Sequence, residues 1–335
     1  MLLAPALADE GRRFSFTYET HIGPFPKDAG PIHVFVPLPA MTPQQDVLEL
    51  DIDASIPGKV ETESRYGNRY WHGVVDASES LAIDVSVTAI VERRVHRNLE
   101  RDERPLSAAE QDDFATFLGA NERVAVGHPI LDPMLAEVRA NRADAGPAAT
   151  ARAIYDWIVD NVEYKKVGSG WGNGDTFWAC SERYGNCTDF HALLISMART
   201  EGLPARFEIG FPVPQDRPSG VIDGYHCWVE LYLPGSGWVP IDASEAFKHP
   251  EKRELFFGTH PADRIHFTTG RDLRLGPDHR AAALNYFVYP YVEVGGVAYE
   301  GIIEKGFRYR DVEEAPATLR SAFEGANHQR SLAGP

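Results

Sequence analysis

The stretch Arg183-Tyr184-Gly185-Asn186-Cys187-Thr188-Asp189-Phe190-His191 places a cysteine at the predicted start of a helix. Asn186 is a favourable N-cap residue, and Asp189 stands where a capping box carries an acid. Apolar residues at helical spacing follow, and Gly202 ends the predicted helix. Cys187 therefore lies in the first helical turn, where unpaired backbone N–H groups and the helix dipole favour a thiolate and can stabilise an oxyanion.

A histidine and an aspartate follow on two segments that alternate like strands. His226 lies near the start of the first segment, and the second ends at Asp242 after a Pro-Gly-Ser-Gly turn. If the turn pairs Tyr232 with Trp238, Asp242 lies on the face of His226, one diagonal step away. A turn of the other parity places Asp242 on the opposite face. A cysteine, a histidine and an aspartate in this order are candidates for a nucleophile, a base and the residue that orients the base.

The three candidate residues could instead have structural roles, and structural roles are expected for the cysteines and the histidine near them. Cys187 itself can be a small buried apolar residue, the usual role of a free cysteine. Alternation places Cys227 on the face opposite His226, which excludes it from the predicted site. His191 is interpreted as a structural hydrogen-bond donor, because a base from the same helix meets the nucleophile at poor geometry. Cys180, Cys187 and Cys227 are too few for a disulfide framework and match no common zinc spacing, so neither a metal nor a cofactor is predicted.

Sequence blocks around these residues resemble the transglutaminase-like superfamily. They are Tyr-Gly-Asn-Cys at 184–187, Gly-Leu-Pro-Ala-Arg-Phe at 202–207, His-Cys-Trp-Val-Glu-Leu at 226–231 and Gly-Trp-Val-Pro-Ile-Asp at 237–242. The resemblance covers roughly residues 150–245 and implies a papain-like α+β core. It also implies that Cys187 is the nucleophile, His226 the base and Asp242 the orienting residue.

The glycine-rich loop at 168–175 lies just before the cysteine helix and is predicted to line the substrate site. It lacks the Lys-Ser/Thr ending of a phosphate-binding loop. The resemblance implies that an upstream aromatic side chain adds a donor to the oxyanion hole. Trp171 is the candidate for this role and Trp178 the second, with core packing or a substrate-facing wall as the alternative for both.

The order of predicted elements divides the chain into an N-terminal β-sandwich at 11–100, a catalytic domain at 104–312 and a tail at 313–335. Residues 13–95 alternate like strands with turns between them, at about the size of an immunoglobulin-like sandwich. Helices are predicted from a capping box at 107–110 through about 118, over 133–140 and from about 147. Strands predicted at 286–289, 292–294 and 307–309 either complete the catalytic sheet or form a small third unit. The predicted fold class is α+β.

Net charge, hydropathy and the N-terminal sequence indicate which binding partners and which cellular location to expect. The formal net charge of −16 argues against nucleic acid and anionic membrane as partners. No apolar run is long enough to span a membrane. Ala6-Leu7-Ala8 before Asp9 resembles a signal-peptide cleavage site, which predicts a periplasmic or secreted protein, with a cytoplasmic location as the alternative. Edge strands in the predicted sandwich are compatible with a monomer or a dimer.

The resemblance implies acyl transfer on the amide bonds of a peptide or protein substrate through a thioester. Water as the acceptor makes the protein a peptidase or amidase, and a lysine amine makes it a protein-glutamine gamma-glutamyltransferase that crosslinks proteins. The sequence contains no EF-hand-like acidic loop, and hydrolysis is the favoured prediction. A non-catalytic binding or scaffold protein is the remaining alternative, although all three candidate residues are present.

Overall fold

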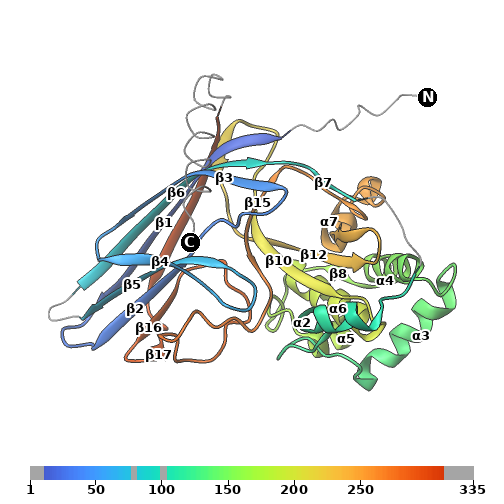
Figure 1. The fold of residues 1–335 in the computed structure, drawn as a ribbon. Helices are drawn as coiled ribbons and strands as arrows, with labels where there is room; N and C mark the ends of the chain where they lie inside the picture. Colours follow the sequence, from blue (N-terminus) through green and yellow to red (C-terminus); the bar gives the residue numbers. More distant parts are fainter. Residues whose placement is uncertain (1–10, 77–80, 99–103, 313–335) are drawn as a thin grey trace, which may run out of the picture.

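The computed structural model describes residues 11–76, 81–98 and 104–312. The predicted cleavage site at residues 6–8, part of the predicted domain boundary and the tail from 313 lie outside the described residues. The helices gather on one side of the molecule and two large sheets occupy the other (Figure 1). The fold is therefore α+β, as the sequence predicted.

Two five-stranded antiparallel sheets form the part of the molecule that is made of strands alone. The first contains β1 (Arg12–Phe25), β3 (Gln45–Ala54), β6 (Leu81–Arg93), β11 (Ser219–Val221) and β18 (Ile303–Asp311). The second contains β2 (Pro31–Pro37), β4 (Gly58–Thr62), β5 (Arg69–Asp76), β16 (Tyr291–Val294) and β17 (Val297–Ala298). The strand orders are β11-β18-β1-β6-β3 and β17-β16-β2-β5-β4. Strands predicted between residues 13 and 95 are thus present, and the alternating apolar side chains of β1 at Phe14, Phe16 and Tyr18 are buried.

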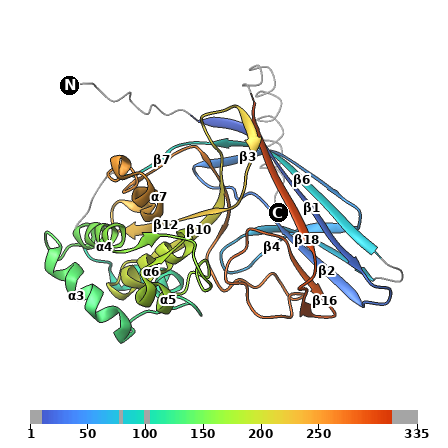
Figure 2. The same ribbon diagram turned by 180° about the vertical axis from the view of Figure 1, so that it is seen from behind.

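The C-terminal strands belong to these two sheets, and this corrects the predicted domain boundaries. β18 pairs with β1 from Phe14 opposite Asp311 to Ile22 opposite Ile303, and β16 pairs with β2. Figure 2 shows β18 alongside β1 and β16 near β2. The β-strand domain is therefore built from both ends of the described chain, because β1 and β2 would otherwise leave backbone groups unpaired at a sheet edge.

The third large sheet positions the candidate site. It is a four-stranded antiparallel sheet with the order β13-β12-β10-β15. Its strands are β10 (Ala205–Pro212), β12 (His226–Leu233), β13 (Gly237–Ile241) and β15 (Arg264–Thr269). Shorter strand pairs are antiparallel β7 (His96–Arg97) with β14 (Thr259–His260) and parallel β8 (Glu163–Tyr164) with β9 (Tyr184–Gly185). Phe16 of β1 packs 5.3 Å from Phe211 of β10 between ring centroids, so the core is continuous from one domain to the other.

Helices cover this sheet, and one of them is almost entirely enclosed. The helices are α1 (Ala108–Asp113), α2 (Ala115–Leu118), α3 (Asp132–Asn141), α4 (Pro147–Asn161), α5 (Thr176–Glu182), α6 (Cys187–Thr200) and α7 (Ala243–Lys248), with 3₁₀ turns at Pro129–Leu131 and Pro250–Lys252. Every residue of α6 from Cys187 to Arg199 is buried. Helix α6 is therefore the central element of the domain, and its N-terminus is fixed by contacts on all sides.

Most predicted helices and two of the three predicted C-terminal strands are confirmed. The capping box at Ser107 and Glu110 is present, but the helix it opens is interrupted at Phe114, which separates α1 from α2. Residues 286–289, predicted as a strand, are irregular. The hydroxyls of Tyr286 and Tyr289 in this segment contact the Gly172 carbonyl oxygen and the Tyr225 N–H. Within the described residues, no helix combines the length and apolar character needed to cross a membrane.

Candidate active site

The N-terminus of α6 presents Cys187 as the first helical residue. Asn186 is the N-cap, and its Oδ1 accepts a hydrogen bond from the Thr188 backbone N–H at 2.9 Å. Asp189 completes the capping box by accepting from the Asn186 N–H at 2.9 Å. The predicted cap is confirmed, and the backbone N–H of Cys187 is one of the helical donors that lack an intrahelical partner.

Asp189 also holds the glycine-rich loop against the helix. Its carboxylate accepts from the backbone N–H of Gly172 at 2.7 Å and of Gly174 at 3.0 Å. Gly185 makes this approach possible, because a Cβ at that position would lie 2.2 Å from Asp189 Oδ2. The loop before Cys187 therefore has its backbone bound directly to the first turn of α6.

The histidine and the aspartate meet as the strand register predicted. Tyr232 pairs with Trp238 between β12 and β13, the pairing on which the prediction depended. His226 Nε2 lies 2.6 Å from Asp242 Oδ2. Asp242 follows β13 as the N-cap of α7 and accepts from the Glu245 N–H at 2.9 Å, which fixes the carboxylate. Because Nε2 of His226 faces Asp242, Nδ1 is the nitrogen left for Cys187.

Cys227 belongs to the same cluster, and its predicted exclusion from the site is wrong. Its Sγ lies 3.4 Å from His191 Nδ1, and it shares a hydrogen bond with Cys187. His191 Nε2 in turn lies 3.6 Å from Asp242 Oδ1. Alternation separates Cys227 from His226 along β12, but it does not say which face of the strand the cysteine helix covers. Helix α6 contacts the face that carries Cys227.

Electrostatics in this buried cluster favour an ion pair between Cys187 and His226. Burial alone raises the pKa of Cys187, but hydrogen bonds with Cys227 and His226 and the charge of the imidazolium outweigh it and hold the pKa well below the ordinary thiol range. Burial lowers the pKa of His226, but the Asp242 carboxylate and the bond to Cys187 outweigh this effect and raise the pKa to about 9. Burial raises the pKa of Cys180 to about 11 and that of Cys227 well above the ordinary range. Of the three cysteines, Cys187 is therefore the one whose thiol pKa is lowered, and His226 is the histidine bonded to it.

The two tryptophans considered for the oxyanion hole use their indole N–H groups elsewhere. Trp171 Nε1 donates to the Gly168 carbonyl oxygen at 3.1 Å, within its own loop. Trp178 Nε1 donates to the Tyr184 carbonyl oxygen at 3.2 Å. An oxyanion role for Trp171 stays a prediction, and it requires the bond to Gly168 to be exchanged for one to the substrate.

The region that contains these residues is similar to known proteins. The family model of the transglutaminase-like superfamily matches residues 136–243, which include α6, β12, β13 and the three candidate residues. The chain has a transglutaminase-like core. An uncharacterised protein of Haemophilus influenzae is 26% identical over 337 residues, spanning 88% of this chain and 89% of that protein. Protein YebA of Bacillus subtilis, also uncharacterised, is 29% identical over 77 residues, or 20% of this chain and 10% of that protein.

The likeness in fold extends beyond the transglutaminase-like core. A crystal structure from Cytophaga hutchinsonii, described as that of a proposed cysteine protease, aligns with 92% of this chain and 93% of its own. The TM-score is 0.59 at 20% sequence identity. The strand domain and the core thus occur together in another protein of the same overall fold.

Tyrosines that the sequence analysis did not single out cover the N-terminus of α6 in the transglutaminase-like core. Tyr225 accepts a hydrogen bond from Asn186 Nδ2 at 3.0 Å, and its hydroxyl is also bonded to that of Tyr286. Tyr286 reaches the Gly172 carbonyl oxygen at 3.4 Å. Only 2% of Cys187 is exposed beneath this cover. The adjacency of Tyr225 to His226 was a signal for the first tyrosine, whereas no local pattern indicated the second.

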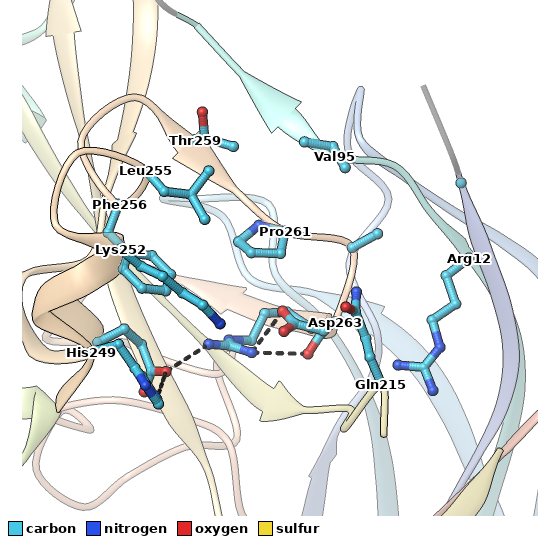
Figure 3. Close-up of a pocket in the computed structure, with 14 residues that line it drawn as sticks. Arg12, Val95, Gln215, His249, Lys252, Leu255, Phe256, Thr259, Pro261 and Asp263 are labelled. Carbon is cyan, nitrogen blue, oxygen red and sulfur yellow. Dashed lines mark hydrogen bonds and ion pairs between the residues drawn. The ribbon is translucent and has the colours of Figure 1, made fainter. Parts of the chain in front are cut away.

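A cavity in the described structure lies apart from the candidate residues. It has a volume of 630 Å³ and lies between β1, the β7–β14 pair and the segment after α7 (Figure 3). Arg12, His249, Lys252 and Asp263 line it in Figure 3, together with Glu245 and Arg264. Neither Cys187 nor His226 is among its lining residues. Glu245, which does line it, donates its backbone N–H to the Asp242 carboxylate.

Proposed function

We propose that the protein is a cysteine-dependent enzyme that transfers acyl groups from amide bonds of a peptide or protein to water. The observation that carries the proposal is the buried contact of 2.6 Å between His226 Nε2 and Asp242 Oδ2 beside a cysteine at a helix N-terminus. A histidine oriented by a carboxylate and bonded to a thiol is the arrangement that activates a cysteine nucleophile. The low pKa of Cys187 supports the same role.

The reaction begins with attack of the Cys187 thiolate on the amide carbonyl carbon. The carbonyl oxygen becomes an oxyanion, to which the backbone N–H of Cys187 donates, with Trp171 as the proposed side-chain donor. The C–N bond then breaks as the His226 imidazolium gives its proton to the departing amine, leaving a thioester on Cys187. Neutral His226 next removes a proton from water, which attacks the thioester and releases the acid and the thiolate. Asp242 stays ionised throughout and holds the imidazole in the required tautomer.

Water is the proposed acceptor in place of a lysine amine. The relative of the same fold from Cytophaga hutchinsonii is described as a proposed cysteine protease, which supports hydrolysis. The same three residues would equally serve crosslinking, because the acceptor alone decides the product. The acceptor must therefore be tested directly.

The test compares three products from one set of glutamine-containing peptides. Purified protein is assayed for peptide cleavage, ammonia release and incorporation of a primary amine, and the thioester is sought by mass spectrometry after acid quenching. Cys187→Ala should abolish all products, whereas Cys180→Ala, which removes a thiol of raised pKa, should retain them. Equal rates for Cys187→Ala and the unaltered protein would exclude a cysteine-dependent enzyme and favour a non-catalytic scaffold protein. Faster amine incorporation than hydrolysis would make the protein a crosslinking enzyme.

We propose further that the protein works in the periplasm or outside the cell. The support is the cleavage-site pattern Ala6-Leu7-Ala8 before Asp9. N-terminal sequencing of the mature protein from its host should begin at Asp9. A mature chain that retains Met1 would contradict export.

A further inference from the structure

Two histidines and an aspartate converge on the outer part of the strand domain, away from Cys187. They are His33 on β2, His72 on β5 and Asp278 in the irregular segment before β16. One potential ligand atom from each residue lies within 4.8 Å of the others. Imidazole and carboxylate groups together suit first-row divalent metals, zinc above all.

Strand pairing places the two imidazoles side by side. His72 pairs with Phe35 between β5 and β2, so His33, two residues before Phe35, lies on the same face and one diagonal step away. His33 Nδ1 and His72 Nε2 are 3.0 Å apart. Two nitrogens that bind one tetrahedral zinc ion at about 2.0–2.1 Å are separated by about 3.3 Å, so a small outward shift of the two rings would admit a shared ion.

The surroundings of His72 orient it as a metal ligand would be oriented. Its Nδ1 lies 3.0 Å from Glu61 Oε2, and that carboxylate is held by Lys59 at 2.7 Å and by the Tyr70 hydroxyl at 3.3 Å. The ring of Phe35 stacks on His72 with centroids 4.4 Å apart and planes at 9°. A carboxylate that accepts from one imidazole nitrogen leaves the lone pair of the other free for a metal, and metal-bound histidines usually have such a partner.

A chain of hydrogen bonds from Glu61 through His72 to His33 is the simpler explanation. It accounts for two of the contacts but not for the carboxylate of Asp278 at the same point. His33 and Asp278 are each only partly buried, so an ion has access from solvent, while His72 is buried. The geometry thus offers three potential ligands that an ion can reach from solvent, and the Glu61 carboxylate fixes the orientation of His72.

We propose that His33, His72 and Asp278 form a binding site for a divalent transition metal such as Zn²⁺, with Glu61 orienting His72. Nδ1 of His33, Nε2 of His72 and a carboxylate oxygen of Asp278 supply three ligands, which leaves a fourth position for water. The site lies outside the family match at residues 136–243 and takes no part in the proposed acyl transfer.

The ion would tie two distant parts of the chain together. Asp278 belongs to the same irregular segment as Asn285, which donates to the Asn173 carbonyl oxygen at 2.7 Å in the glycine-rich loop. A metal at Asp278 fastens this segment to β2 and β5. We therefore expect metal binding to raise the thermal stability of the protein, as any ligand specific to the folded state does.

The experiment uses the full chain carrying Cys187→Ala, so that the reactive thiolate does not compete for metal. Zn²⁺ binding is measured by calorimetry and Co²⁺ binding by its visible absorption. The melting temperature of each metal-free variant shows whether that variant is folded. One equivalent should bind, and His33→Ala and Asp278→Asn should each lose it. Glu61→Gln should bind about 10- to 100-fold more weakly, the usual effect of removing the carboxylate that orients a metal-bound histidine.

His21→Ala is the matched control, because His21 Nδ1 on β1 lies 2.7 Å from Asp84 on β6 in an exposed histidine–carboxylate pair. It should bind metal as the parent does. An absence of saturable binding in the parent would overturn the proposal, as would binding that His33→Ala and Asp278→Asn leave unchanged. These outcomes do not depend on the proposed enzymatic activity.

Discussion

At the residue scale, the cluster around Cys187 is larger than a triad. Cys227 shares a hydrogen bond with Cys187, and this bond lowers the pKa of the Cys187 thiol. We expect Cys227→Ala to shift thiolate formation at Cys187 to higher pH, measured by the ultraviolet absorbance of the thiolate. Cys180→Ala, which removes a thiol outside the cluster, should leave the titration unchanged. An unaltered titration in Cys227→Ala would show that His226 alone sets the pKa.

The protonation of His226 sets the alkaline limit of the proposed reaction. Its folded-state pKa is raised to about 9, so the imidazolium that protonates the leaving amine is present below this pH and is lost above it. We expect kcat/KM to fall as the pH rises through about 9. The raised pKa also contributes stability that is complete below the ordinary histidine pKa of about 6.5 and is lost as the pH rises through the folded value. A rate that keeps rising well above this pH would argue against His226 as the acid.

Trp171 provides a test of the oxyanion hole at the same scale. Trp171→Phe keeps an aromatic ring but removes the indole N–H, so loss of an oxyanion donor should lower kcat by about 10²- to 10³-fold with little change in KM. Trp178→Phe, which removes an N–H bonded to the Tyr184 carbonyl oxygen, is the comparison. Equal, small effects of both substitutions would leave Trp171 as a residue of the loop wall.

At the scale of elements, the glycine-rich loop and α6 depend on the close approach at Gly185. A methyl group there would meet the Asp189 carboxylate that binds the loop. We expect Gly185→Ala to destabilise the protein by about 1–3 kcal/mol, the usual cost of overpacking, and to lower activity through the displaced loop. Gly306→Ala is the control, because a Cβ at Gly306 has no neighbour within 4 Å. Urea unfolding and the peptide assay measure the two effects, and a fully active Gly185→Ala protein would contradict the role given to the loop.

The sequence predicts some elements correctly and others not. The difference is whether the residues that interact are close together or far apart along the chain. The cap at Asn186 and the pairing of Tyr232 with Trp238 depend on neighbouring residues, and both are confirmed. The pairing of Phe14 with Asp311 joins opposite ends of the described chain and leaves no local pattern, so the C-terminal strands were assigned to the wrong domain. Cys227 was misplaced because strand alternation shows only which residues share a face. Which face a helix covers is decided by tertiary packing, which the strand sequence does not contain.

At the scale of the whole molecule, aromatic side chains join the strand domain to the four-stranded sheet β13-β12-β10-β15. Phe307 of β18 lies 4.6 Å from Tyr18 of β1 and 4.4 Å from Phe211 of β10, between ring centroids. We expect Phe307→Ala to cost about 3–5 kcal/mol and to lower the stability of both domains in one unfolding transition. Arg308→Ala removes an exposed pair with Glu19 and should cost about 0–1 kcal/mol. Two separate transitions in denaturant, only one of them shifted, would show that the domains are not coupled.

The partnership of β1 with β18 also has a consequence for biosynthesis. The ribosome makes β1 well before β18, so the sheet that contains both cannot close until β18 has been synthesised. During that interval the nascent chain exposes the edge of β1, which is a template for pairing with other chains. A chaperone that shields this edge would therefore act in the interval between the synthesis of β1 and that of β18.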